Sequence, residues 1–359
     1  MVKLVMRNAN SAASLLLSLL FVFSVAGQNK GPTRSNAVLW RDPGNISRRD
    51  LRYGPGSAAL APKPPFSYLE EDKVGASPKI KVKDREGVEW VVKLGIESQS
   101  ETVSNRLVWA MGYFAEEAYY LDRVEVRGLP KLSRGREFVE NQRFLRGARF
   151  EPRRDNIKRG ETWKWLKNPF AGTRELNGLK TLMVLLANYD TRPENNRVLE
   201  VSDPRNGRKE YQYAVTDIGA TLGRIGGMGG KRTKNNLSDY KDNRFIKKVE
   251  DGFVEFDYRT RPKGLGYFTF VFSPGYWRSQ SDKEKAMKRI PVAHARWIGT
   301  MLSQLSNDQL RDAFRAANYD PATMEGYIAT IRSHINQLAS LPNATGRSQR
   351  VASIRPVGK

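Results

Sequence analysis

The feature that most constrains this chain is a polar loop, Asn188 to Asn195, between a helical pattern and a hairpin pattern. Before the loop, leucine and methionine recur at helical spacing over residues 173–187, and Thr173 is placed to cap that helix. After the loop, two strand-like runs surround a turn rich in Asp, Pro, Asn and Gly. This order predicts a helix that ends beside Asp190 and a β-hairpin that ends beside Asp217.

Asp190, Asn195 and Asp217 are the residue types that phosphoryl transfer from a nucleotide requires. One carboxylate orients the attacking hydroxyl, while an amide and a second carboxylate hold magnesium. The string Asp-x-x-x-x-Asn alone is common by chance and is normally a solvated turn. The prediction therefore depends on the helix and the hairpin that surround the two polar segments.

The N-terminal half contains a second hairpin pattern. Residues 79–82 alternate charged and apolar side chains, residues 84–87 form a turn, and residues 88–94 continue as a strand. Because side chains alternate along a strand, Val91 and Lys93 share one face. We expect Val91 to cover an adenine while Lys93 reaches the phosphates.

The segments on either side of this hairpin supply further candidates. Ser77, Lys79 and the backbone N–H groups beside them are available to phosphate oxygens, although an ordinary turn fits equally well. Glu101, on the helix that follows, is the candidate to pair with Lys93. In the alternative, Ser98 and Glu101 form a capping box, and Glu101 then bonds only to the start of its own helix.

Together these segments resemble the HipA-type and phosphatidylinositol-kinase-type atypical kinases and their exported bacterial relatives. The segments that carry the resemblance are Gly75 to Lys79, Glu89 to Lys93, Asn188 to Asn196 and Thr216 to Gly219. The resemblance covers roughly residues 66–225. It implies a two-lobed, kinase-like α+β fold, with an antiparallel sheet and a helix over residues 66–130 and a mostly helical lobe over residues 131–342.

The resemblance also implies ATP and Mg²⁺ as cofactors and gives each site residue a role. The implied catalytic residues are Asp190, which acts as the base, Lys93 and Arg192. The implied nucleotide-binding residues are Ser77, Lys79, Val91, Lys93 and Glu101. The implied metal ligands are Asn195 and Asp217. The His-Arg-Asp and Ala-Pro-Glu strings of ordinary protein kinases are absent. The same metal site would also serve transfer of AMP.

The ends of the chain differ from its middle. Residues 1–27 combine two early cations with a short apolar run and small residues, as in a signal peptide, with an uncleaved anchor as the alternative. The chain has no cysteine, which favours a bacterial periplasm over a eukaryotic secretory route. Residues 28–65 are expected to form an extended lead-in, and residues 343–359 a basic disordered tail.

Charge indicates the class of partner. The formal net charge of +23 attracts acidic envelope polymers and anionic lipids, while export makes nucleic acid a poor candidate. Residues 129–168 mix basic and aromatic side chains, and a solvated strand-rich connector is favoured there over a polyanion-binding surface.

The sequence thus predicts an exported, ATP- and magnesium-dependent phosphotransferase whose acceptor it does not identify. Two alternatives stay open. One is a kinase-fold pseudoenzyme that binds an envelope component, and the other is a basic polyanion-binding protein without catalysis.

Overall fold

The computed structural model describes residues 36–75, 77–203, 205–225, 232–260 and 274–343. The expected signal peptide and basic tail lie outside these residues. Within them the fold is α+β, with seven α-helices and three sheets. None of the helices in the described ranges is long and apolar enough to cross a membrane.

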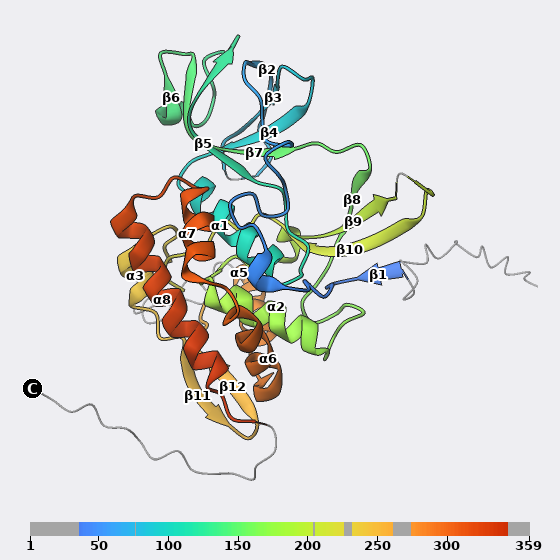
Figure 1. Ribbon diagram of the computed structural model, residues 1–359, viewed down its shortest axis with the longest axis vertical. Helices are drawn as coiled ribbons and strands as arrows, with labels where there is room; N and C mark the ends of the chain where they lie inside the picture. Colours follow the sequence, from blue (N-terminus) through green and yellow to red (C-terminus); the bar gives the residue numbers. More distant parts are fainter. Residues whose placement is uncertain (1–35, 76, 204, 226–231, 261–273, 344–359) are drawn as a thin grey trace, which may run out of the picture.

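A five-stranded barrel occupies one end of the molecule (Figure 1). Its strands are β2 Phe66–Asp72, β3 Lys79–Lys83, β4 Glu89–Leu94, β5 Tyr119–Arg127 and β7 Phe144–Pro152. They follow the order β4-β3-β2-β5-β7, and β7 pairs again with β4 to close the ring. The β2–β5 contact is parallel and short, whereas the other pairs are antiparallel. The short strand β6 (Val139–Glu140) pairs with β7.

The β3–β4 hairpin forms over the predicted residues, and its second strand has the predicted faces. Lys79 lies opposite Lys93, and alternate residues of β4 point into the barrel core. Trp90 is buried there and donates a hydrogen bond from its indole Nε1 to Asp84 Oδ2 at 3.0 Å. The period-two pattern therefore leaves Val91 and Lys93 on the face away from the barrel core, as expected.

The prediction of a solvated connector over residues 129–168 is wrong, because this segment contains β7. Instead of a solvated connector, β7 lies between β4 and β5, and Phe150 is fully buried in the barrel core. Trp163 and Trp165 are buried as well, so these aromatic rings are not available to a polyanion on the surface. The barrel thus extends to Pro152, beyond the boundary expected at residue 130.

Helix α1 (Glu97–Ala110) packs against the barrel strands and against helix α7. The capping box of Ser98 and Glu101, the alternative to the Lys93 pairing, does not form, because the helix begins at Glu97 and Ile96 occupies the N-cap without a side-chain bond. Gly95, with φ of +110°, turns the chain directly after β4, so Ser98 already lies in the first turn. The Ser98 hydroxyl donates to the carbonyl of Lys93 at 3.0 Å instead.

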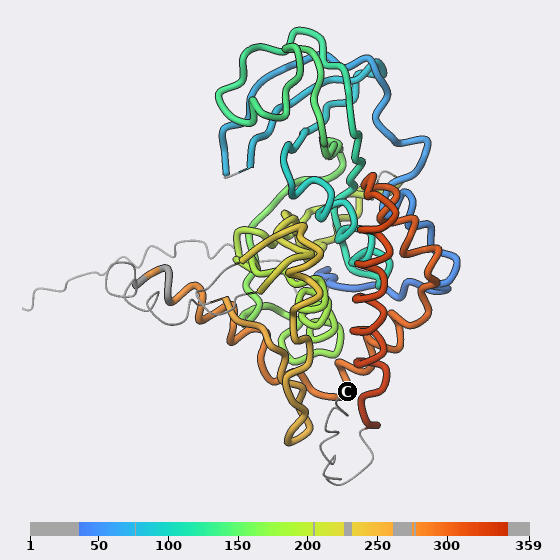
Figure 2. The backbone as a smooth tube through the Cα atoms, turned by 90° about the vertical axis from the view of Figure 1, so that its left-hand side faces the viewer, coloured from blue at the N-terminus to red at the C-terminus, as the bar shows by residue number. Residues whose placement is uncertain are grey.

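The remaining helices surround a second hydrophobic core. They are α2 Arg174–Leu185, α3 Leu237–Lys241, α5 Pro274–Ala286, α6 Val292–Leu302, α7 Asn307–Arg315 and α8 Pro321–Ala339. Thr173 caps α2 by accepting from Leu176 N at 3.2 Å, as predicted, and Ser306 caps α7. Figure 2 shows these helices between the barrel at one end and the β11–β12 hairpin at the other.

Two smaller sheets complete the fold. Their strands are β1 Ala37–Val38, β8 Ile157–Thr162, β9 Asn196–Ser202 and β10 Lys209–Val215 in one sheet, and β11 Ile246–Glu250, β12 Phe253–Phe256 and β13 Ile290–Pro291 in the other. The antiparallel pair β9–β10 is the hairpin predicted between the Asn188 to Asn195 loop and Asp217.

The lead-in has little regular structure, as expected, but it packs closely on the second core. Strand β1 pairs in parallel with β10, and Leu39, Ile46 and Leu51 are buried. Arg41 N donates to the carbonyl of Gly112 at 2.9 Å. Gly112 has φ of +86°, and a Cβ atom there would lie 2.1 Å from Arg41 O. The lead-in therefore requires glycine at this position.

Candidate functional site

A polar cleft of about 450 Å³ lies where the barrel meets the sheet of β8, β9 and β10. Its charged lining consists of Lys79, Lys93, Arg149, Arg153, Arg159 and Arg197 with Glu116, Glu151, Glu194 and Asp217. Cations therefore outnumber carboxylates in the lining. A volume of this size is in the range of small-molecule sites.

Lys93 lies at the centre of the charged groups in this cleft. Its Nζ contacts Asp217 Oδ1 at 2.5 Å, Glu97 Oε2 at 2.8 Å and Glu101 Oε2 at 3.0 Å. The side chain is only 3 % exposed. Burial alone would lower the pKa of Lys93, but the carboxylates of Glu101, Asp217 and Glu97 outweigh it and raise the pKa. The ammonium therefore stays charged throughout the physiological range.

The predicted partner of Lys93, Glu101, is fully buried on α1. Its Oε2 also lies 3.3 Å from Arg149 Nε, while its Oε1 is buried without a hydrogen bond. Burial raises the pKa of Glu101, although Arg149 and Lys93 oppose that shift. Glu101 does not cap its own helix, because α1 begins one turn earlier.

Glu97 is a second carboxylate on α1 that contacts Lys93. Burial would raise the pKa of Glu97, but Lys93 and Lys234 together lower it to about 2. Ser77 donates to Glu97 Oε2 at 2.9 Å, so the loop before β3 is tied to the helix as well. The spacing of Glu97 four residues after Lys93 and four before Glu101 was available in the sequence as a signal.

Asp190 is held by three side chains. Arg192 Nε and Lys283 Nζ lie 2.8 Å and 3.1 Å from its Oδ1, and Asn195 Nδ2 donates to its Oδ2 at 3.2 Å. Burial would raise the pKa of Asp190, but Lys283 and Arg192 outweigh it and lower the pKa. Asp190 is therefore a carboxylate at neutral pH.

The β9–β10 hairpin connects the two ends of the predicted site. Thr216 N donates to Asn195 O at 2.8 Å, which places the loop of Asp190 and Asn195 next to Asp217. Asp217 has φ of +51°, the left-handed region, directly after β10. The structure thus brings Lys93, Asp217, Asn195 and Asp190 into one continuous chain of contacts.

Asn195 and Asp217 carry the oxygens that a hard cation would use. Asn195 donates through Nδ2, and its Oδ1 accepts no hydrogen bond from a described residue. Asp217 engages Lys93 through Oδ1, and its side chain is 55 % exposed. Magnesium is commonly held by one or two protein oxygens together with substrate phosphates, so these residues fit it. No group of three or more His, Cys, Asp or Glu side chains in the described ranges is arranged for a metal ion.

The other expected nucleotide contacts also line the cleft. Val91, Ser77 and Lys79 all belong to its wall. Lys79 Nζ lies 3.6 Å from Asp72 Oδ2, and the two residues form the pair at one end of the β2–β3 ladder. The structure thus places the predicted residues of β3 and β4 on the same side as Lys93 and Asp217.

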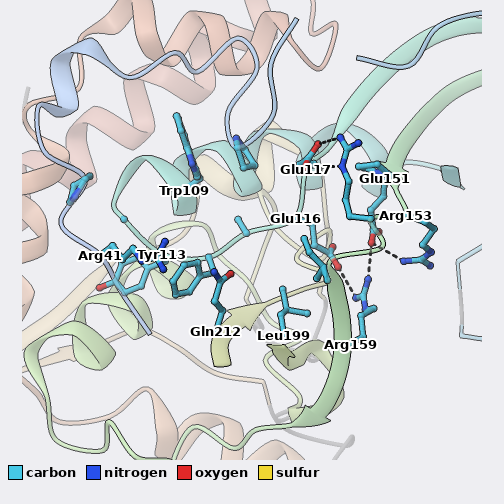
Figure 3. A pocket seen from close by; sticks show the side chains of 18 of the residues that line it. Arg41, Trp109, Tyr113, Glu116, Glu117, Glu151, Arg153, Arg159, Leu199 and Gln212 are labelled. Carbon is cyan, nitrogen blue, oxygen red and sulfur yellow. Dashed lines mark hydrogen bonds and ion pairs between the residues drawn. The ribbon is translucent and has the colours of Figure 1, made fainter. Parts of the chain in front are cut away.

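A second cavity of about 630 Å³ adjoins the cleft. The two share the side chains of Glu116, Glu151, Arg153 and Arg159. Figure 3 shows Arg159 bonded to Glu116 and Glu151 on one side of this cavity, with Trp109 and Tyr113 on the other. These four charged residues therefore form a wall between the cavity and the cleft.

Two further residues of the site were not foreseen. Lys283 reaches Asp190 from α5, and Arg149 faces Lys93 across the β4–β7 pair. Both contacts join segments that are remote in the chain, so no local pattern indicates them. Sequence reasoning had treated Arg149 as one cation among many in a basic segment.

Comparisons of the chain with protein-family models, with curated proteins and with solved structures find no match.

Proposed function

We propose that the chain is an ATP- and magnesium-dependent phosphotransferase of the atypical kinase type. In this proposal the barrel and α1 act as the N-lobe of a two-lobed fold and the second core as the C-lobe. The observation that carries the proposal is the position of Lys93, which contacts Glu101 of α1 and Asp217 after β10 at once. Protein kinases place a lysine–glutamate ion pair at the nucleotide phosphates and an aspartate on the magnesium ion, and residues of these three types meet here.

The roles of the side chains follow from their contacts. Lys93 would exchange Asp217 for phosphate oxygens while Glu101 keeps the ammonium pointed into the cleft. Asp190 would accept the proton of an acceptor hydroxyl as its oxygen bonds to the γ-phosphorus and the β–γ bridging oxygen leaves with ADP. Arg192 and Lys283, which both contact Asp190, would face the transferred group.

Asn195 and Asp217 are the residues that would hold Mg²⁺. The bound ion would neutralise negative charge on the phosphate oxygens. Two features support this assignment: the free Oδ1 of Asn195 and the exposed carboxylate of Asp217 at the end of the same hairpin.

The acceptor is proposed to be an acidic, hydroxyl-bearing component of the bacterial envelope. The supporting observations are the net charge of +23 and the apolar segment near the N-terminus, which together suit an exported protein acting near polyanions. Transfer of AMP instead of phosphate would use the same residues.

A thermal-shift titration of the purified chain tests the proposal. ATP with Mg²⁺ should raise the melting temperature of the wild type, and Asp217→Ala should lose most of that shift. Incubation with γ-labelled and α-labelled ATP then separates phosphoryl transfer, nucleotidyl transfer and binding alone. Absence of any response to ATP with Mg²⁺ in the folded wild type would exclude the proposed function.

The second candidate is a binding protein without turnover. The observation that favours it is the cavity of about 630 Å³ next to the cleft, which is the larger of the two and, unlike the cleft, does not include Asp217 in its wall. Under this alternative an envelope component would occupy that cavity. ATP would then give neither a thermal shift nor labelled product.

A further inference from the structure

We propose that Arg149 forms, with Lys93, a two-cation subsite that binds a phosphate group of the ligand in the cleft. The inference deepens the proposed function by naming the ligand class as oligophosphates rather than nucleosides. The two residues lie directly opposite each other on β4 and β7, and both line the cleft. Cross-strand neighbours project to the same face of a sheet, so both charges are directed at one space.

The guanidinium of Arg149 is buried but not fully bonded. It is 3 % exposed, its Nε lies 3.3 Å from Glu101 Oε2 in an ion pair, and its NH1 makes no hydrogen bond to a described residue. NH2 donates to Glu151 Oε2 at 3.2 Å, while Glu116 Oε2 lies 3.8 Å from NH1. Buried donors without an acceptor are costly, so a group with free donors beside a cleft indicates a missing acceptor.

The neighbouring Arg159 provides the contrast. Its NH1 and NH2 each donate at 2.7 Å, to Glu151 Oε1 and to Glu116 Oε1. Those two carboxylates are thus already engaged by a guanidinium with good geometry. Glu101 approaches Arg149 at Nε and Glu151 at NH2, so a structural role as the counter-ion of these carboxylates leaves NH1 without a hydrogen-bond acceptor among the described residues.

The charge of the cleft fits an anion of several negative charges. Its lining holds six cationic and four acidic side chains, and Arg197 forms no ion pair with a described residue. Guanidinium binds phosphate oxygens through paired N–H donors, and ammonium binds them as a point charge. Arg149 and Lys93 together would therefore hold a phosphate more tightly than either alone.

Calorimetry with inorganic tripolyphosphate, ATP with Mg²⁺ and adenosine tests the subsite on the purified full chain. Arg149→Met should weaken tripolyphosphate binding about tenfold or more and leave adenosine unchanged. Arg149→Lys, which keeps the charge but loses the paired donors, should give an intermediate loss. The matched control is Arg143→Met, which removes an exposed cation that pairs with Glu125 outside the cleft and should change tripolyphosphate binding by about twofold at most.

Several results would overturn the subsite. They are equal tripolyphosphate affinity in the wild type and Arg149→Met, an equal loss for adenosine, or an equal loss in Arg143→Met. Should Arg149→Met not fold, Arg149→Lys decides, and wild-type affinity in that variant rejects the proposal. If tripolyphosphate binds through Arg149 but ATP with Mg²⁺ does not bind, the kinase function fails while the anion subsite stands. Absence of tripolyphosphate binding to the wild type rejects the subsite outright.

Discussion

Lys93 of β4 and Asp217 after β10 form a direct ion pair of 2.5 Å between groups 124 positions apart in the chain. The pair joins the barrel to the hairpin that also supports Asn195. Phosphate binding at Lys93 would have to replace this contact, so ligand affinity and the attachment of the barrel to the hairpin are coupled. The predictions below start from this group of charges.

Replacement of Lys93 should destabilise the fold. Lys93→Met removes the cation that three carboxylates share, one of them fully buried, and breaking a buried pair costs about 3–5 kcal/mol. Urea denaturation of the purified chain measures the loss. Lys79→Met, a cation in the same cleft that is more exposed, should cost less than about 1 kcal/mol. An equal loss of unfolding free energy in the two variants would contradict the claim that Lys93 holds the three carboxylates together.

Asp190→Asn should separate turnover from binding. The substitution keeps the shape of the side chain but removes the proton acceptor, so the rate of ATP turnover should fall about 10²–10⁴-fold. The affinity for ATP with Mg²⁺, measured by thermal shift, should be nearly unchanged. Asp203→Asn, in the turn of the β9–β10 hairpin, serves as control and should retain the wild-type rate. An unchanged rate in Asp190→Asn would remove this residue from the role of base.

Glu97 should make stability depend on pH in acid. Its pKa is lowered to about 2 in the folded chain from an ordinary value of 4.5, so the unfolded chain binds the proton first. The stabilisation is present above pH 4.5 and is lost as the pH falls through about 2. The full loss is on the order of 3 kcal/mol.

Glu97→Gln should therefore be less stable than the wild type near neutral pH and converge with it toward pH 2. Denaturation curves at several pH values test this convergence. Glu89→Gln, an exposed carboxylate on β4, should follow the wild-type dependence. A constant difference between wild type and Glu97→Gln at all pH values would refute the assignment.

Gly112→Ala should destabilise the chain more than Gly128→Ala. Both glycines have positive φ, which costs an L-residue about 1–2 kcal/mol. At Gly112 the new Cβ would also lie 2.1 Å from Arg41 O, whereas the space around Gly128 is open. The difference between the two variants in urea denaturation measures how firmly the lead-in is packed. Equal losses would indicate that the lead-in moves aside freely.

Most of the regular elements could be predicted, because their signals are local. The alternation in β4 places Lys93 and Trp90 on opposite faces, and Thr173 marks the start of α2. These two inferences needed only spacing and capping chemistry. The expected pairing of Lys93 with Glu101 came from the kinase pattern, with a capping box as the alternative.

The rest depended on contacts between distant segments. Arg149 and Lys283 reach the site through barrel closure and through α5, and neither arrangement has a periodic pattern. The start of α1 was misjudged because the turn at Gly95, rather than a capping side chain, determines it. Burial of Trp163 in the second core was missed because a mixture of basic and aromatic residues has no period of its own.

Closure of the barrel gives β4 a hydrogen-bonded neighbour along both edges, β3 on one and β7 on the other. A strand without a free edge offers no template to a second polypeptide, which protects this end of the molecule from self-association. Backbone amides of β4 that are bonded on both sides are expected to exchange slowly with solvent. The ammonium of Lys93 is thus carried on a doubly paired strand, two of its carboxylate partners on helix α1, and only Asp217 on a loop.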